Sequence, residues 1–221
     1  MSELFDAYAN TRSRMLAVAQ NVGPQALQAN VPACPDWSAH QLLSHCVSMP
    51  AALSAGDFPT GDPNEWIDGL VSRYQDKSLD ELAEVWSSVD ETIAGMLDGG
   101  GGMLFDDLAV HEHDLRAAVQ QPDHSALETA VLLPRVVASC TDALIAQGLG
   151  SIEVRSGSQS WRSHDAEPGW ILELSPWEAT RAIYSRRTAE ELRSLGAGPD
   201  QERCIELLDA HLPLPVSSLN E

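Results

Sequence analysis

The chain has 221 residues, of which 43% are hydrophobic, and this is enough for one sizeable core plus a smaller appended unit. Its net charge of −20, with Lys77 as the sole lysine, argues against partners of dense negative charge such as nucleic acid and anionic membrane surfaces. No apolar run approaches the roughly 20 residues that a membrane-spanning helix needs. The N-terminal segment carries acids and no apolar stretch of the kind found in secretory signals, so we expect a cytoplasmic protein.

Helical periodicity dominates the first two-thirds of the chain. The first apolar pattern runs at helical spacing from the N-terminus to Gly23-Pro24, which is expected to end that helix. A second helix is expected to begin at Ser38, which forms a capping-box pattern with Gln41. Residues 56–63 are rich in Gly, Pro and Asp and indicate a loop.

Further helices are expected to complete this helical region. A capping box at Ser78 opens a helix that the glycine run 99–102 ends. A helix over 104–120 follows, and another spans 127–147, where Pro134 should kink the helix or mark its true start.

The pattern changes after residue 150. Apolar and polar residues alternate over 152–155 and in part over 170–174, and turn signals lie between them, so we expect two or three short antiparallel strands. Helix starts follow at Ser175 and Thr188, and a last short helix is expected over 200–210. The sequence thus predicts a mainly α protein, with a helical bundle over residues 1–149 and a small α+β domain over residues 150–221.

One helix carries a candidate metal-binding pair. Asp107 and His111 are four residues apart, so they project from one helix face and could share a divalent ion. Asp114, three residues further on, could orient the imidazole. Such pairs also occur as surface ion pairs, but the apolar neighbours Leu108 and Leu115 indicate that part of this segment faces a core.

Other candidate ligands are the histidine and cysteines of the second helix region. His45 lies on an amphipathic helix and could be either a ligand or a hydrogen-bonded core histidine. The four cysteines are far apart and form no CxxC pair, so we expect reduced thiols, with Cys34 and Cys46 in structural roles.

Three segments, in chain order, resemble motifs of one known family. Residues 33–45 (Ala-Cys-Pro-Asp-Trp-Ser-Ala-His-Gln-Leu-Leu-Ser-His) resemble C-P-G-W-(S/T)-x-x-x-L-L-x-H, residues 107–114 resemble E-x-x-x-H-x-x-D, and residues 185–187 resemble a later G-R-R element. These motifs are typical of the mycothiol-dependent maleylpyruvate isomerase family, within the DinB-like superfamily of metal-binding four-helix bundles. The resemblance runs from about Leu4 to Leu214 and implies a DinB-like bundle.

The resemblance implies a metal site of two histidines and a carboxylate, usually occupied by zinc. Residue by residue, His45 and His111 match the histidines, and Asp107 stands where the family has Glu. Because Asp is one methylene shorter, its helix must approach the ion more closely or the carboxylate must bind differently. Three protein ligands would leave an open position, as in catalytic zinc sites.

The resemblance also implies an enzyme that uses mycothiol, a low-molecular-weight thiol, as an isomerase or S-transferase on a small electrophile. Asp114 and Arg186 are the candidate catalytic residues, with Arg186 holding a substrate carboxylate. Arg186 could instead be a helix-end arginine paired with Glu178 or Glu190. Two other functions remain open, a metal-binding module without catalysis and a metal-dependent hydrolase.

Overall fold

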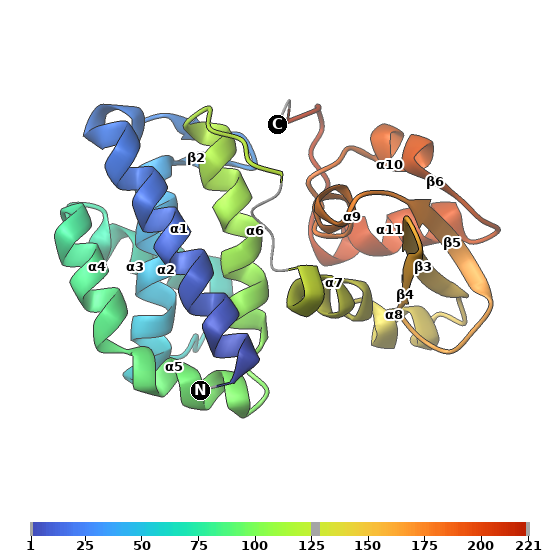
Figure 1. Cartoon of the computed structure of the whole chain (residues 1–221), viewed down its shortest axis with the longest axis horizontal. Helices are drawn as coiled ribbons and strands as arrows, with labels where there is room; N and C mark the ends of the chain where they lie inside the picture. Colours follow the sequence, from blue (N-terminus) through green and yellow to red (C-terminus); the bar gives the residue numbers. More distant parts are fainter. Residues whose placement is uncertain (1, 125–128, 220–221) are drawn as a thin grey trace. The chain divides into compact units, whose positions relative to one another are not determined.

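The computed structural model describes residues 2–124 and 129–219, which are mainly helical with a small sheet in the C-terminal part (Figure 1). The chain forms two compact units, Met1–Asp123 and His124–Glu221, so the division lies earlier than the expected boundary at residues 149 and 150. Within the described ranges, no helix combines the length and the hydropathy that crossing a bilayer requires.

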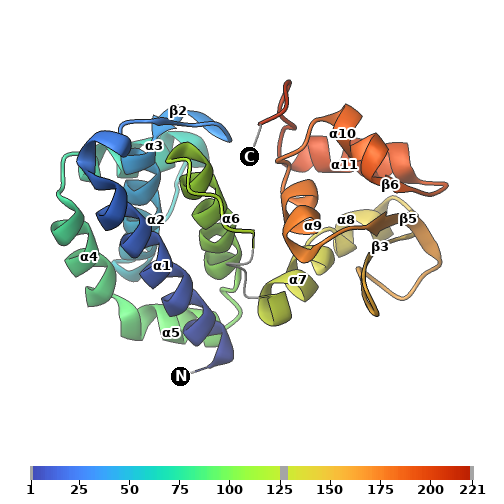
Figure 2. The ribbon, with the colours of Figure 1, turned by 45° about the horizontal axis from the view of Figure 1, so that its top comes forward.

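The N-terminal unit is built from helices around a shared core. α1 packs against α4 and α6, and α2 packs against α4 and α6 from the other side, so these four helices follow one another around a ring (Figures 1 and 2). The bounds of the elements are α1 (Glu3–Ala26), β1 (Asn30–Val31), β2 (Cys34–Ser38), α2 (Ala39–Ser54), α3 (Pro63–Tyr74), α4 (Leu79–Ser88), α5 (Asp90–Asp98) and α6 (Met103–Ala118).

The core of this unit is mainly apolar and includes a polar contact between Trp86 and Tyr8. Its fully buried side chains include Met15, Leu42 and Phe105. The indole N–H of Trp86 donates to the Tyr8 hydroxyl at 2.7 Å, which satisfies both polar groups inside the core.

The local signals at helix ends are confirmed. The Ser38 side chain accepts from the Gln41 N–H at 3.2 Å, and the Gln41 side chain accepts from the Ser38 N–H at 3.0 Å. The same reciprocal cap forms at Ser78. At Gly23, φ is 78° and the regular helix is interrupted, although one further turn follows it.

Several elements differ from expectation. α3 was not predicted, and neither was the β1–β2 hairpin. The single helix expected from Ser78 to the glycine run is two helices, because Val89 leaves the helical conformation (φ −107°, ψ 7°) between α4 and α5. Asp90 then starts α5 and pairs with Arg12 of α1, which ties this break to the neighbouring helix.

The C-terminal unit contains a four-stranded sheet and short helices. Its elements are α7 (Thr129–Ala138), α8 (Thr141–Ala146), β3 (Ser151–Ser156), β4 (Gln159–Arg162), β5 (Pro168–Glu173), α9 (Pro176–Ile183), α10 (Ala189–Leu195), β6 (Gly196–Ala197) and α11 (Gln201–His211). The helix expected over 127–147 begins in residues outside the described ranges. Pro134 lies inside α7 without ending it, and the helix breaks instead at Ser139, whose hydroxyl donates to the Val136 carbonyl at 2.7 Å.

The strand order is β4-β3-β5-β6. β3 pairs antiparallel with β4, as expected, but it pairs parallel with β5, so the expectation of an all-antiparallel sheet was wrong. The cause is the chain path, since β4 lies on one edge of β3 and the chain then crosses to the other edge. α7 contacts β3, β4 and α9, which explains why it belongs to this unit and not to the helical one.

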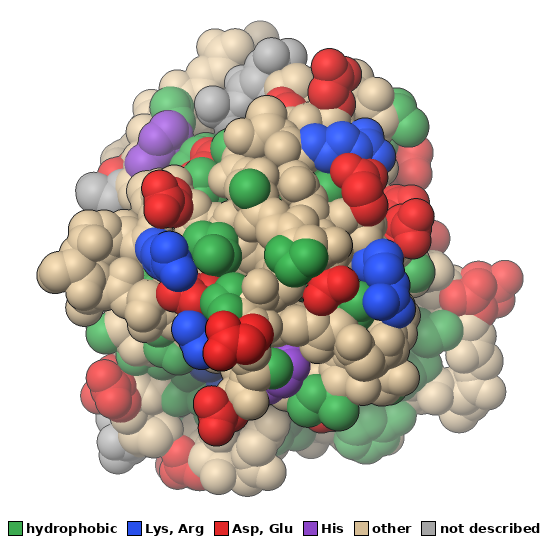
Figure 3. All heavy atoms as spheres, turned by 90° about the vertical axis from the view of Figure 1, so that its right-hand side faces the viewer, with side chains coloured by type: hydrophobic (Ala, Val, Ile, Leu, Met, Phe, Trp, Pro, Cys, Tyr) green, Lys and Arg blue, Asp and Glu red, His purple; other side chains and the backbone are tan. Residues whose placement is uncertain are grey.

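Several charged side chains of the C-terminal unit form ion pairs. In Figure 3, basic side chains lie beside acidic ones. Arg193, for example, contacts Glu202 at 3.0 Å, and both side chains are more than half exposed. Such solvent-exposed pairs contribute little to stability, so the unit depends on the buried sheet face around Trp170 and Leu172.

Ser185 has a backbone conformation that is unfavourable for a residue with a side chain. It is buried and has φ 59°, a left-handed conformation that favours glycine, and the motif it resembles has glycine at this position. Ser185→Gly is therefore expected to raise the free energy of unfolding by about 0.5–1 kcal/mol, as measured by urea denaturation. A lower value in the variant would show that the hydroxyl outweighs the backbone strain.

Candidate metal centre

The structure brings together the three residues proposed as metal ligands. His45 projects from α2, while Asp107 and His111 project from α6, which packs against α2. One potential ligand atom from each residue lies within 4.8 Å of the others. Residues separated by more than sixty positions in the sequence therefore converge on one point.

The two separations between Asp107 and the imidazoles are close to those around a small divalent ion. His45 Nε2 lies 3.4 Å from Asp107 Oδ2, and His111 Nε2 lies 3.4 Å from Asp107 Oδ1. These distances are longer than ordinary hydrogen bonds. Each is close to the edge of about 3.3 Å that zinc bonds of about 2.0–2.1 Å give in a tetrahedral site, and the two imidazoles face different oxygens of the carboxylate. The shorter aspartate side chain therefore reaches both imidazoles.

The site is buried on its histidine side and open at its carboxylate. His45 and His111 are 3% and 6% exposed, whereas the Asp107 side chain is 40% exposed. The two rings lie edge to face, with centroids 5.2 Å apart and planes at 85°. A molecule approaching from solvent would meet the site beside Asp107.

Asp114 orients the His111 ring. Its Oδ2 lies 2.9 Å from His111 Nδ1, and the Asp114 side chain is fully buried. We assign a proton to Nδ1, because a carboxylate can only accept; when the ring is neutral, this leaves the Nε2 lone pair on the side of Asp107. The contact that the sequence spacing predicted is thus present.

Asp114→Asn is expected to weaken zinc binding about 10–100-fold, because the amide can no longer raise the basicity of the imidazole as a carboxylate does. Chelator competition on the purified protein measures this change. Asp106→Asn, on the same helix but outside the donor set, is the control. Equal affinity in the wild type and the Asp114 variant would remove Asp114 from the site.

His45 is held differently. Its Nδ1 is buried and has no hydrogen-bond partner in the described part of the chain. The Trp37 ring of β2 packs against it instead, with centroids 5.0 Å apart and planes at 34°. Packing therefore restrains His45, whereas a charged hydrogen bond restrains His111.

The charges of the site are strongly coupled. Burial opposes protonation of His111, but the carboxylates of Asp107 and Asp114 outweigh it and raise the pKa of His111 to about 9. Burial alone would raise the pKa of Asp107, but the His111 charge and the N–H groups of both imidazoles hold it far below its usual range. The two carboxylates therefore favour a positive charge at His111.

This coupling predicts a pH dependence. Zinc must displace a proton from His111, so its affinity is expected to rise about tenfold per pH unit from pH 7 to pH 8.5 and to level off near 9. In the metal-free protein, the raised pKa of His111 gives stability that is complete below pH 6.5 and lost as the pH rises through about 9. Chelator competition across this range measures the slope, and an affinity that is constant above pH 7 would contradict the assignment.

The sequence interpretation missed the position of Cys34. We expected a structural thiol, but potential ligand atoms of Cys34, His111 and Asp114 also lie within 4.8 Å of one another. The β1–β2 hairpin places Cys34 there, and this hairpin was not predicted. Cys46 is buried, as a structural thiol would be.

Glu112 was also overlooked. It is 1% exposed and accepts from Arg14 at 2.8 and 2.9 Å and from Arg116 at 3.0 and 3.1 Å. Arg14 also donates to the buried Thr11 hydroxyl at 3.0 Å. This network connects α1 to α6 beside His111 and fixes the helix that carries two of the candidate ligands.

Arg186 belongs to the C-terminal unit. It is 7% exposed, and its Nη1 donates to the Tyr184 carbonyl at 2.7 Å. The pairing with Glu178 that was considered for Arg186 is made by Arg187, at 2.7 and 3.0 Å. Arg187 also lies over the Trp177 ring. A role for Arg186 in holding a substrate carboxylate stays a prediction.

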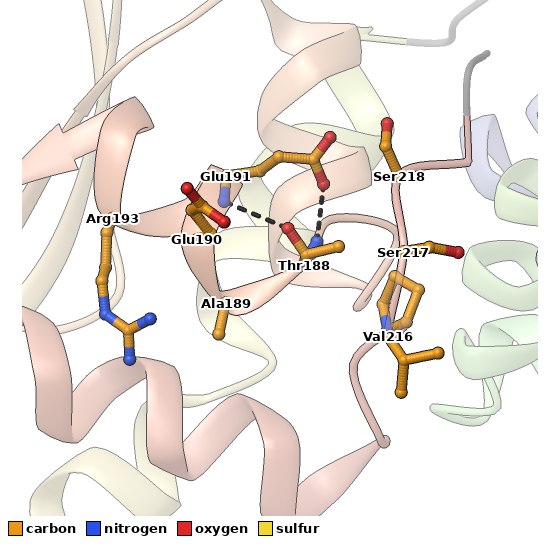
Figure 4. A pocket seen from close by; sticks show the side chains of 9 residues that line it. Thr188, Ala189, Glu190, Glu191, Arg193, Val216, Ser217 and Ser218 are labelled. Atoms are coloured by element: carbon orange, nitrogen blue, oxygen red, sulfur yellow. Dashed lines mark hydrogen bonds between the residues drawn. The ribbon is translucent and has the colours of Figure 1, made fainter.

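A separate hollow of about 580 Å³ lies in the C-terminal unit between α10 and the segment that includes Val216 (Figure 4). The polar groups at its base cap α10, since the Thr188 N–H donates to Glu191 at 2.7 Å and Thr188 Oγ1 accepts from the Glu191 N–H at 3.1 Å. None of the candidate metal or catalytic residues lines this hollow.

Comparison of the chain with protein-family models, with curated proteins and with solved structures gave no match in any of the three.

Proposed function

We propose that this protein binds one divalent ion, with zinc expected, through His45, Asp107 and His111. The observation that carries the proposal is the pair of 3.4 Å separations that place one Asp107 oxygen toward each imidazole Nε2. The proposed DinB-like fold is a metal-binding bundle, which would explain why the ligands come from two helices that pack together, α2 and α6. The donor set of two nitrogens and a carboxylate suits zinc.

We further propose that the protein is a thiol-dependent isomerase or S-transferase for a small electrophile, like the maleylpyruvate isomerase family that its motifs resemble, with mycothiol as the expected thiol. A zinc ion with three protein ligands lowers the pKa of a thiol or water that takes its open position. The protein's own part is to orient the ligands. Asp114 accepts the Nδ1 proton of His111, Trp37 packs against His45, and Asp107 is the ligand whose side chain is exposed to solvent.

A cobalt-substituted protein tests thiol binding without knowledge of the substrate. The experiment uses the Cys34→Ser variant, so that this nearby protein thiol cannot contribute to the signal. Addition of a low-molecular-weight thiol is expected to produce a thiolate-to-cobalt absorption band. The band should be absent in His45→Ala and retained in His40→Ala, a histidine on the same helix outside the donor set.

Turnover then separates the proposed activity from its alternatives. Consumption of a small electrophile that needs both metal and thiol would support the thiol-dependent enzyme. Turnover without thiol would indicate a hydrolase. Metal binding with neither a thiol band nor turnover would indicate a metal-binding module without catalysis.

A further inference from the structure

Cys34 gives the molecule a second group of candidate ligand atoms, together with His111 and Asp114. Potential ligand atoms of Cys34, His111 and Asp114 lie within 4.8 Å of one another. Asp114 faces the ring through Nδ1 at 2.9 Å, whereas the first donor set uses Nε2 of the same ring. The β2 strand supplies Cys34, and α6 supplies the other two residues.

The chemistry of the two donor sets differs. The first set offers nitrogen and oxygen only, whereas the second adds sulfur, and soft thiolate ligands select thiophilic ions such as Cd²⁺ and Cu⁺. We infer that Cys34, His111 and Asp114 form a second metal-binding site, selective for thiophilic ions, that shares His111 with the first. This site needs neither His45 nor Asp107, so it does not depend on the function proposed above.

The shared ring makes the two sites alternatives. A neutral imidazole has one lone pair and one N–H. His111 can bind an ion through Nε2 while its Nδ1–H donates to Asp114, or through Nδ1 while its Nε2–H points toward Asp107. In the second state the Asp114 oxygen must move away from Nδ1, since two ligands of one ion lie farther apart than the 2.9 Å of this hydrogen bond.

Cys34 is also the cysteine most accessible to an ion from solvent. It is half-buried, while Cys46, Cys140 and Cys204 are 3%, 5% and 0% exposed. An ion arriving from solvent therefore reaches the Cys34 thiol before the other three.

Cadmium titration of the metal-free, full-length protein tests the inference through the thiolate-to-cadmium absorption band in the near ultraviolet. The wild type is expected to develop the band to an end point of about one equivalent. The band should be lost in Cys34→Ser and retained in Cys46→Ala, the matched cysteine control. It should also be retained in Asp107→Asn, which removes the carboxylate of the first site.

Retention of the band in Cys34→Ser, or its absence from the wild type, would overturn the inference. Loss of the band in Asp107→Asn would also overturn it, because Cys34 would then belong to the first site. If the first site fails to bind zinc while the cadmium band remains, only the function proposed above is contradicted.

A second measurement needs no variant. Cadmium is expected to slow alkylation of Cys34 by iodoacetamide at least about tenfold in the wild type, as mapped by peptide mass spectrometry, because coordination occupies the sulfur lone pair. An unchanged alkylation rate would contradict the inference even if Cys34→Ser failed to fold.

Discussion

Replacing His111 with asparagine is expected to reduce bound zinc from about one per chain to less than about a tenth. The asparagine amide can stand where Nδ1 stands and donate to Asp114, so the buried carboxylate keeps a hydrogen-bond partner. It provides no donor atom in place of Nε2, which lies 3.4 Å from Asp107. The variant should therefore fold and still fail to hold the ion.

Elemental analysis of the purified variant gives its zinc content, and circular dichroism confirms its fold. The His111→Ala variant also removes the hydrogen-bond partner of the buried Asp114 carboxylate. It should therefore lower the free energy of unfolding by about 3 kcal/mol. His40→Ala is the control for loss of a histidine. Full zinc content in His111→Asn would show that the site is misassigned.

The second large effect is expected at Glu112. Glu112→Ala should lower the free energy of unfolding by about 3–5 kcal/mol, because it leaves Arg14 and Arg116 without the buried carboxylate that both contact. Urea denaturation measures the change. Glu84→Ala, an exposed acid on α4, should change the same quantity by less than about 0.5 kcal/mol.

Zinc content distinguishes this structural role from a ligand role. Glu112 is next to His111 in the sequence, but its carboxylate is engaged by the two arginines and is outside the donor set. The Glu112→Ala protein should therefore keep about one zinc per chain under conditions in which it is still folded. Loss of zinc from folded variant protein would mean that the acid belongs to the metal centre.

Local chemistry explains which parts of the fold were predictable. The caps at Ser38 and Ser78 depend on residues three positions apart, so the sequence alone specifies them. The contact between His111 and Asp114 lies within one helical turn, so it could also be predicted from the sequence. The overall class, mainly α with a small C-terminal sheet, followed from the change in periodicity after residue 150.

The parts that were missed depend on contacts distant in the sequence. The parallel pairing of β3 with β5 is set by where the chain crosses, which alternation of apolar residues does not encode. The break at Val89 accompanies the Arg12–Asp90 pair between two helices. In the same way, Cys34 reaches His111 only because a short hairpin folds back, and residue spacing gave no sign of it.

The candidate metal centre was predictable only in part. Spacing placed Asp107 and His111 on one face, but only the packing of α2 against α6 sets the distance to His45. The resemblance to the family motifs groups these three residues as one site. The geometry adds the reach of the aspartate, which one missing methylene had made the least certain contact of the set.

Diffraction from crystals of the zinc-loaded protein, with data collected at the zinc absorption edge, tests the central claim most directly. The account predicts one anomalous peak per chain between Nε2 of His45, Nε2 of His111 and the carboxylate of Asp107. The absence of a peak there, or a peak held by other residues, would contradict it.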